Sequence, residues 1–419
     1  MKTNLNFAHN PILPADCFIP DVEAHTWGDG RIYLYGSFDI QGREQYCSDV
    51  YHVYSSDDMV NWTDHGQSFS LADTAWARDC AALYAPDCAY KDGWYYLYYC
   101  VPDGRCGVAK SQSPTGPFED VGPIEGVWGI DPAVLVDDDG QAYIYWGQLT
   151  WGKAAKLKDN MVEIDPDTVT DMLTIEEHEF HEGSSVKKIN GKYYFLFADT
   201  HRHGNRPTSL GYAVSDTPLG KYEYKGVLID NFGCDPSVWN NHGSMECFKG
   251  QWYVFYHRST HNGVMSRHVC VEPIFLDEEG NIGEVKQTTS GVGAPIPAKN
   301  HFPANLACEL TGRAYLAGDP DSPENLVLTR VGDGDTATYR YLQFNDETTF
   351  RIRMKNNAEC RVELYLNGWY QTDFKVAASE TYADTEVKIP AAKGTEFTFT
   401  LHFYGEGLDA SVESFTFAE

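Results

Sequence analysis

The sequence predicts an all-β protein made of a five-bladed β-propeller followed by a β-sandwich domain. Three observations predict this fold class. One turn-and-strand signal recurs five times in about the first 290 residues, and aromatic residues make up 14% of the chain, with 27 tyrosines and 10 tryptophans. The last third of the chain alternates apolar and polar residues without a helical period. Aromatic and β-branched side chains favour strands, so all three observations agree.

The recurring signal is a turn dipeptide that ends in glycine and precedes a strand rich in Tyr, Leu, Ile, Val and Phe. The five glycines are Gly30, Gly93, Gly140, Gly191 and Gly250, and strands such as RIYLYGS, WYYLYYC and QAYIYWG follow them. Asp-Gly and Asn-Gly dipeptides between apolar runs are strong hairpin signals, because both central residues of a type I′ turn take positive φ. Successive glycines are 63, 47, 51 and 59 residues apart. Each interval holds about four short strands, the content of one propeller blade.

The two domains are expected at residues 1–295 and 296–419. Composition shifts after the segment GVGAPIPAKN, residues 291–300. The chain beyond it contains runs such as YRYLQF, CRVELYLNG and TEFTFTLHF. No helix-period segment interrupts these strands, which favours a β-sandwich.

Charge and cysteine content exclude several classes of protein. The chain has 32 basic and 61 acidic residues, a net charge of −29, which repels phosphate backbones and anionic lipids. We therefore expect neither a nucleic-acid nor a membrane partner. The 11 cysteines include no Cys-x-x-Cys pair, which favours free thiols in a reducing compartment. The N-terminal segment MKTNLNFAHN has no apolar core, so we expect no signal peptide and a cytoplasmic location.

Acidic residues recur at a fixed distance from the turn glycines. Ligands bind propellers at one end of the central channel, where the innermost strands begin. Nine residues before the five glycines lie Asp21, Tyr84, Asp131, Glu182 and Asn241, and His242 follows the last of these. Equivalent register predicts that these side chains lie at one level around the channel. Three acids in five equivalent positions are the most specific signal in the chain.

Three converging carboxyl groups in an aromatic-rich channel are typical of glycoside hydrolysis. That reaction needs one protonated and one ionised carboxyl group on either side of the scissile bond. Crowding of like charges raises the proton affinity of one member, and aromatic rings stack on the apolar faces of sugars. The structural alternative is that these acids cap strands or line a solvated channel.

The sequence around the three acids resembles glycoside hydrolase family 43. The similarity lies in Asp21 of IPDVEAHTWGDGRIYLYGS, Asp131 of GIDPAVLVDDDGQAYIYWG and Glu182 of HEGSSVKKINGKYYFLFA. LYAPDCAYKDGWYYLYY and NNHGSMECFKGQWYVFYH resemble the motifs of the second and fifth blades. The resemblance covers roughly residues 8–295.

The first motif departs from the family pattern. The family often has Asp-Pro at this position, whereas this chain has Asp21 followed by Val22. Alignment through Gly28 keeps Asp21 in place, with Asp16 and Glu23 as nearby alternatives.

The resemblance implies roles for these residues. Asp21 would be the general base that activates water, and Glu182 the general acid that protonates the leaving oxygen. Asp131 would keep the proton on Glu182 and position it. The reaction would invert the anomeric configuration. His242 would contact a bound metal, usually calcium, through its hydration shell, since calcium prefers oxygen ligands. No organic cofactor is expected.

Candidate substrate contacts are Arg267, Trp76, Phe38, Tyr84 and Asn241. A structural role is an equal alternative for the first three. Arg267 would then form a salt bridge in the fifth blade, and the aromatic side chains would pack in the core.

The resemblance implies an exo-acting hydrolase that releases β-D-xylose or α-L-arabinofuranose from xylo- or arabino-oligosaccharides. We favour β-xylosidase with arabinofuranosidase side activity. The alternatives are an endo-arabinanase and a non-catalytic sugar-binding propeller. An invertase-like propeller would need a Trp-x-Asn-Asp-Pro-Asn-Gly type motif, which the sequence lacks, and a sialidase would need several Asp-box repeats.

The ending ASVESFTF resembles family 6 carbohydrate-binding modules in its strand pattern. Trp369 and Tyr370 are candidates for a sugar-stacking platform. A structural role for this domain, shaping the pocket, is slightly favoured over independent polysaccharide binding.

Overall fold

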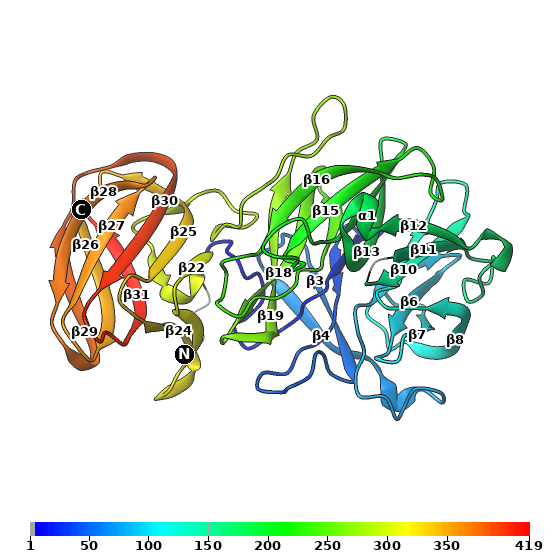
Figure 1. Ribbon diagram of the computed structural model, residues 1–419, viewed down its shortest axis with the longest axis horizontal. Helices are drawn as coiled ribbons and strands as arrows, with labels where there is room; N and C mark the ends of the chain where they lie inside the picture. Colours follow the sequence, from blue (N-terminus) through cyan, green and yellow to red (C-terminus); the bar gives the residue numbers. More distant parts are fainter. Residues whose placement is uncertain (1–4, 150) are drawn as a thin grey trace.

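The computed structural model describes residues 5–149 and 151–419 of the chain. Two bodies of β-structure lie side by side in it, the propeller formed by the first part of the chain and the sandwich formed by the last part (Figure 1). The predicted five-bladed propeller followed by a sandwich is confirmed. Among the described residues, no helix is long and apolar enough to cross a membrane.

Five antiparallel sheets form the blades. The strands of the first two are β1 (Glu23–Thr26), β2 (Ile32–Tyr35), β3 (Val50–Ser56), β4 (Trp62–Ser70), β5 (Asp87–Lys91), β6 (Trp94–Cys100), β7 (Arg105–Ser111) and β8 (Glu119–Trp128). The third and fourth contain β9 (Ala133–Val136), β10 (Ala142–Gln148), β11 (Trp151–Lys156), β12 (Thr170–Thr174), β13 (Phe180–Ile189), β14 (Lys192–Asp199), β15 (Ser209–Ser215) and β16 (Glu223–Asp230). The fifth contains β17 (Ser244–Phe248), β18 (Gln251–Thr260) and β19 (Gly263–Ile274). The helix α1 (Ile175–His178) precedes β13, and short 3₁₀ turns lie at Leu71–Asp73, Pro166–Thr168 and Ala304–Leu306.

The first strand of each blade lines the central channel. These five strands contact one another in a closed ring, β1 against β5 and β17, β9 against β5 and β13, and β13 against β17. Between the blades, apolar side chains from neighbouring sheets pack into shared clusters; Tyr99 and Leu83, for example, pack with Tyr35 and Val53 of the first blade. The channel is thus the one region where polar side chains from all five blades meet.

The turn glycines behave as the hairpin signal requires, with φ between 77° and 85°. The type I′ turn is confirmed at Gly93, Gly191 and Gly250, where the preceding residue also has positive φ. The prediction of a type I′ turn is wrong at Gly30 and Gly140, because the aspartate before each glycine does not have positive φ. Those two turns are longer, with Gly30 N–H bonded to Trp27 O at 2.9 Å, as in hairpin loops that end in a left-handed glycine.

The N-terminal segment closes the ring along the outer edge of the fifth blade. Ile12 N–H donates to Val269 O in β19 at 3.1 Å. The buried Asn10 side chain donates to Val271 O and Thr288 O, at 3.0 and 3.2 Å, and accepts from Val271 N–H at 2.9 Å. Residues about 260 positions apart in the chain thus complete the three-stranded fifth sheet.

The sandwich contains two six-stranded sheets. One has β20 (Ile296–Pro297), β22 (Glu309–Thr311), β25 (Thr336–Asn345), β27 (Cys360–Leu366), β28 (Trp369–Val376) and β30 (Lys393–Tyr404). The other has β21 (His301–Pro303), β23 (Tyr315–Asp319), β24 (Ser322–Val331), β26 (Thr349–Asn356), β29 (Ser379–Lys388) and β31 (Ala410–Ala418). Alternate residues of both sheets, such as Phe350, Phe399 and Phe415, form one core between them.

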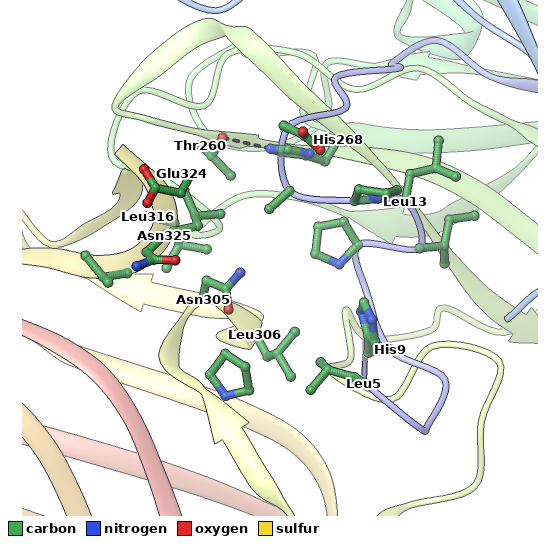
Figure 2. Close-up of a pocket in the computed structure, with 18 of the residues that line it drawn as sticks. Leu5, His9, Leu13, Thr260, His268, Asn305, Leu306, Leu316, Glu324 and Asn325 are labelled. Atoms are coloured by element: carbon green, nitrogen blue, oxygen red, sulfur yellow. Dashed lines mark hydrogen bonds between the residues drawn. The ribbon is translucent and has the colours of Figure 1, made fainter. Parts of the chain in front are cut away.

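The sandwich is joined to the propeller by backbone hydrogen bonds. His261 N–H donates to Leu316 O, and Leu310 N–H donates to Gly233 O, each at 2.6 Å. A cavity of about 930 Å³ lies at this junction, lined by residues of both domains and of the N-terminal segment. Figure 2 shows His9 and Asn305 on its wall.

Candidate active site

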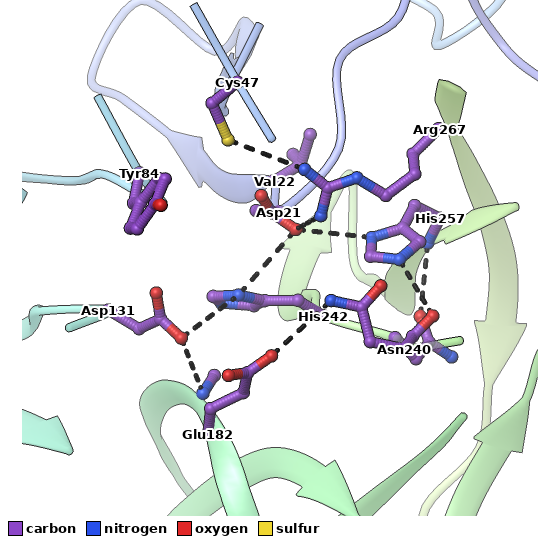
Figure 3. A network of polar contacts seen from close by, with 12 residues as sticks. Asp21, Val22, Cys47, Tyr84, Asp131, Glu182, Asn240, His242, His257 and Arg267 are labelled. Atoms are coloured by element: carbon purple, nitrogen blue, oxygen red, sulfur yellow. Dashed lines mark hydrogen bonds and ion pairs between the residues drawn. The ribbon is translucent and has the colours of Figure 1, made fainter. Parts of the chain in front are cut away.

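The three acids converge at one level of the channel, as their common offset predicts (Figure 3). Asp21 and Asp131 each lie two residues before an inner strand, β1 and β9, and both have φ of 57°. Aspartate is one of the few non-glycine residues that tolerates this left-handed conformation. Glu182 lies in β13 between two register shifts in its pairing with β14. Local backbone irregularity therefore turns each carboxyl group out of the sheet.

Asp21 is held by a buried arginine. Arg267, 2% exposed, donates from Nη1 to Asp21 Oδ1 at 2.8 Å, and His257 Nδ1 lies 3.4 Å from the same oxygen. Asp39 fixes the guanidinium by accepting from Nε and Nη2 at 2.8 and 2.9 Å. Burial opposes ionisation, but the Arg267 charge beside it holds the pKa of Asp21 well below its usual range. Asp21 is therefore a carboxylate.

The pKa of Asp131 is shifted in the opposite direction to that of Asp21. Its side chain is buried and accepts from Gly183 N–H at 3.0 Å. Burial, followed by the charge of Glu182, raises the pKa of Asp131 well above its usual range. Glu182 accepts from Gln148 Nε2 at 2.9 Å and lies 3.5 Å from Asn240 Nδ2. Burial and the Glu182 charge thus favour a proton on Asp131 itself.

The His242 side chain lies between Asp21 and Asp131. Its Nδ1 is 3.9 Å from Asp21 Oδ1 and 3.7 Å from Asp131 Oδ2. Burial lowers the pKa of His242, so the imidazole is neutral. Gly183 lies against the ring: it has φ of 78°, and a Cβ there would lie 3.2 Å from the imidazole. Only glycine suits this position.

The residues around His242 offer calcium few free ligands. Calcium takes six to eight oxygens. The nearest oxygen of Asp21 is already paired with Arg267, and Asp131 carries a raised pKa, so neither supplies a free anion. A calcium ion near His242 would therefore be coordinated almost wholly by water molecules. The side chains present do not fit direct coordination of this ion. A compact set of donors, Glu23, His25 and Asp87, lies elsewhere, with one ligand atom of each within 4.8 Å of the others.

Two of the expected substrate contacts have close protein partners in the structure. The Arg267 guanidinium donates to Asp21 and Asp39, so the salt bridge named as its structural alternative is present, and contact with substrate stays a prediction. Asn241 is fully buried: its Nδ2 donates to Thr208 O at 3.0 Å and its Oδ1 accepts from His257 N–H at 3.3 Å. With no exposed surface, the Asn241 side chain is not accessible to a sugar in this structure.

The aromatic candidates are divided between packing and the site. Trp76 stacks on Tyr99 with ring centroids 5.8 Å apart and lies under the Arg105 guanidinium. Phe38 stacks on His52 at 4.7 Å. Both rings thus have packing partners but are partly exposed, and substrate contact by either stays a prediction. Tyr84 lies near Asp131 in Figure 3 and stays a candidate substrate contact.

The exposed aromatic pair of the sandwich lies away from this centre. Trp369 is 77% and Tyr370 52% exposed, at the start of β28. Carbohydrate binding by this domain stays a prediction.

Sequence reasoning missed several residues that hold the acids: Asp39, Gln148, Asn240 and His257. A second offset could have found three of them. Since the second strand of each blade runs back to the same end of the channel, residues seven to nine positions after the turn glycine return to the level of the acids. Asp39, Gln148 and His257 lie at those positions.

The geometry brings together an ionised carboxylate, Asp21, and a carboxyl group with a raised pKa, Asp131, with Glu182 beside them. Such an arrangement can deprotonate water on one side of a bond and protonate a leaving oxygen on the other.

Comparison with known proteins agrees with this chemistry. The sequence model of glycosyl hydrolases family 43 matches residues 8–282. The chain is 29% identical to a xylosidase/arabinosidase of Thermoclostridium stercorarium, over 97% of this chain and 98% of that protein. A family 43 arabinoxylan arabinofuranohydrolase from Bacillus subtilis, solved with cellotetraose, has a TM-score of 0.58 at 25% identity and covers 98% of this chain and 97% of its own. A β-xylosidase/α-arabinofuranosidase from a compost metagenome, solved with xylotriose in a calcium-free form, has a TM-score of 0.58 at 30% identity and covers 66% of this chain and 98% of its own.

Proposed function

This chain belongs to glycosyl hydrolase family 43, and on that premise we propose that it is an inverting exo-glycosidase. The proposed reaction releases terminal β-D-xylose, α-L-arabinofuranose or both from xylo- or arabino-oligosaccharides. The relatives named above include xylosidases and arabinosidases, which supports substrates of this class.

The observation that carries the proposal is that the pKa values of Asp21 and Asp131 are shifted in opposite directions. Arg267 keeps Asp21 ionised, whereas burial and the charge of Glu182 raise the pKa of Asp131. Pairs of titratable groups whose pKa values are driven apart mark acid–base sites. Here Asp21 is the ionised group, and Asp131 is the neighbour of the proposed acid, Glu182.

In the proposed mechanism Asp21 accepts a proton from water, which attacks the anomeric carbon. Glu182 donates a proton to the leaving oxygen as the glycosidic bond breaks. The Glu182 side chain is 12% exposed and that of Asp131 is 5% exposed, so Glu182 is the member of the pair that reaches substrate. Asp131 is proposed to position Glu182 from its buried place beside it, and Gln148 donates a hydrogen bond that orients Glu182.

The test is to assay aryl β-D-xyloside and aryl α-L-arabinofuranoside side by side and follow the anomer of the released sugar by NMR. We expect the first-formed product to have the inverted configuration. Glu182→Gln should lower kcat by about 10²–10⁴-fold, the usual contribution of a general acid. Product of retained configuration would refute the mechanism, and release of internal fragments from arabinan would support an endo-arabinanase instead.

A further inference from the structure

The floor of the propeller channel holds a second buried polar network, which the proposed reaction does not use. We propose that Lys187 is the resident cation of this network, that it takes the place of a divalent metal, and that it positions the catalytic carboxyl groups. The positioning part rests on the proposed function.

Lys187 is surrounded by acceptors from two neighbouring strands. Its Nζ donates to Ala24 O at 3.1 Å, to His25 Nδ1 at 3.3 Å and to Glu246 Oε2 at 3.1 Å, and lies 4.0 Å from Glu23 Oε2. An ammonium group has three donors, and all three are used. Burial alone would lower the pKa of Lys187, but the surrounding carboxylates raise it, so the side chain is charged.

The lysine also fixes the state of the neighbouring histidine. Since Lys187 only donates, His25 Nδ1 must present a lone pair, and the ring proton therefore lies on Nε2. That nitrogen is 2.7 Å from Asp87 Oδ1 and donates to it. A metal bound at His25 Nε2 would need this proton removed and a proton placed on Nδ1, facing the ammonium. The set formed by Glu23, His25 and Asp87 is therefore closed to a metal while Lys187 is present.

The charges agree with this assignment. Three carboxyl groups, those of Glu23, Asp87 and Glu246, surround this one ammonium group. Removing the ammonium would leave buried negative charge without a partner, which is costly.

The network joins all five inner strands. Lys187 is on β13 and Glu246 on β17, His25 is on β1 and Asp87 on β5, and Asp87 Oδ2 accepts from Val134 N–H of β9 at 2.6 Å. A single cation thus connects the ring of strands on which the catalytic groups are mounted.

The catalytic acids lie only a few residues away on the same strands. Asp21 is two residues before Glu23, Asp131 three before Val134, and Glu182 five before Lys187. Because a misplacement of about 1 Å can cost 10²-fold in rate, the spacing that Lys187 sets at the floor matters for the reaction above it.

The test compares Lys187→Met with Lys188→Met. Lys188 is the next residue of β13 and pairs with Asp137 and Asp138 outside the channel, so its loss is the matched control. Both variants and the unaltered chain are dialysed against chelator and then titrated with Mn²⁺ and Ca²⁺. Melting temperature, bound metal by calorimetry, and kcat and KM are measured at each stage.

We expect the unaltered chain and Lys188→Met to bind no cation at the set formed by Glu23, His25 and Asp87, so Glu23→Gln alone should not change their response to chelation or to either cation. Lys187→Met should melt lower, lose at least about tenfold in kcat with little change in KM, and bind one Mn²⁺ that restores part of both losses. Adding Glu23→Gln to Lys187→Met should abolish that rescue, because it removes a ligand.

Loss of stability in the unaltered chain on chelation that a cation restores, and that Glu23→Gln abolishes, would overturn the proposal. So would a Lys187→Met variant with unchanged melting temperature and kcat. If Lys187→Met does not fold, the same measurements on the milder variant Glu246→Gln, together with chelation of the unaltered chain, still test the proposal. If the chain hydrolyses neither aryl substrate, the proposed function fails, while the melting and metal-binding data continue to test the resident cation.

Discussion

Replacing Arg267 with methionine should move the acid limb of the pH–rate profile toward neutrality. Arg267 Nη1 lies 2.8 Å from Asp21 Oδ1, and both side chains are buried. An opposite charge this close lowers the pKa of a carboxyl group by about 1–3 units, and burial without it raises the pKa. In the proposed mechanism Asp21 must be ionised to act as the base, so activity should fall as the pH falls through the pKa of Asp21.

The assay is kcat/KM against pH, which reports the ionisation of the free enzyme. Since the pKa of Asp21 is well below its usual range, the unaltered enzyme should keep its base ionised until acid unfolds it. In Arg267→Met the acid limb should rise by about 1–3 pH units, while circular dichroism shows that the protein is still folded. Arg267→Lys keeps the charge but loses the bidentate contact with Asp39. Its acid limb should lie between those of the unaltered enzyme and Arg267→Met.

Asp39→Asn is the matched control for this prediction. It perturbs the same buried cluster but leaves the guanidinium on Asp21, so its acid limb should not rise. A folded Arg267→Met with the acid limb of the unaltered enzyme would refute the reasoning, because Asp21 would then owe its ionisation to something other than Arg267.

Three further predictions test the supports of the site and the ring. Gly183→Ala should lower kcat at least tenfold, because the new Cβ meets the His242 ring and φ of 78° is strained for alanine; stopped assays and thermal melting check this, and unchanged kcat would contradict it. Gln148→Leu should lower kcat about tenfold with little change in KM, since Glu182 loses the donor that orients it; an equal loss in the double variant with Glu182→Gln and in Glu182→Gln alone would support that link. Asn10→Ala should destabilise the propeller by about 2–4 kcal/mol, because buried partners lose their hydrogen bonds; denaturant unfolding measures this, and a change below about 0.5 kcal/mol would count against it.

The repeating features of the molecule were predictable from the sequence. Gly30 and its counterparts mark the hairpins, and the position nine residues earlier faces the channel because each blade has the same pleat and register. Asp131 and Glu182 could therefore be placed near Asp21 although more than a hundred residues separate the first from the last.

Contacts that do not repeat were beyond the same reasoning. Arg267 and Asp39 are 228 residues apart and meet only because the first and fifth blades are neighbours in the closed ring. No periodicity in the sequence encodes which side chains of the first and fifth blades pair with each other. Asn241 has the expected register, but backbone groups of an adjoining loop take up its amide. The offset predicts where a residue lies, and the partners it finds there decide what it does.

The seam between the two ends of the propeller also sets an order of events during synthesis. Asn10 and Ile12 pair with Val269 and Val271, and Asn10 also bonds Thr288 O. Early blades can form as they leave the ribosome, but the ring cannot shut until residue 288 has emerged, and contacts of such long sequence separation form slowly. Until the N-terminal segment docks on it, the edge of β19 has no strand beside it, and an open edge of this kind invites pairing with another chain. Shortening the N-terminus past Asn10 would make that transient state permanent, so truncated forms should be recovered as aggregates rather than as weak enzymes.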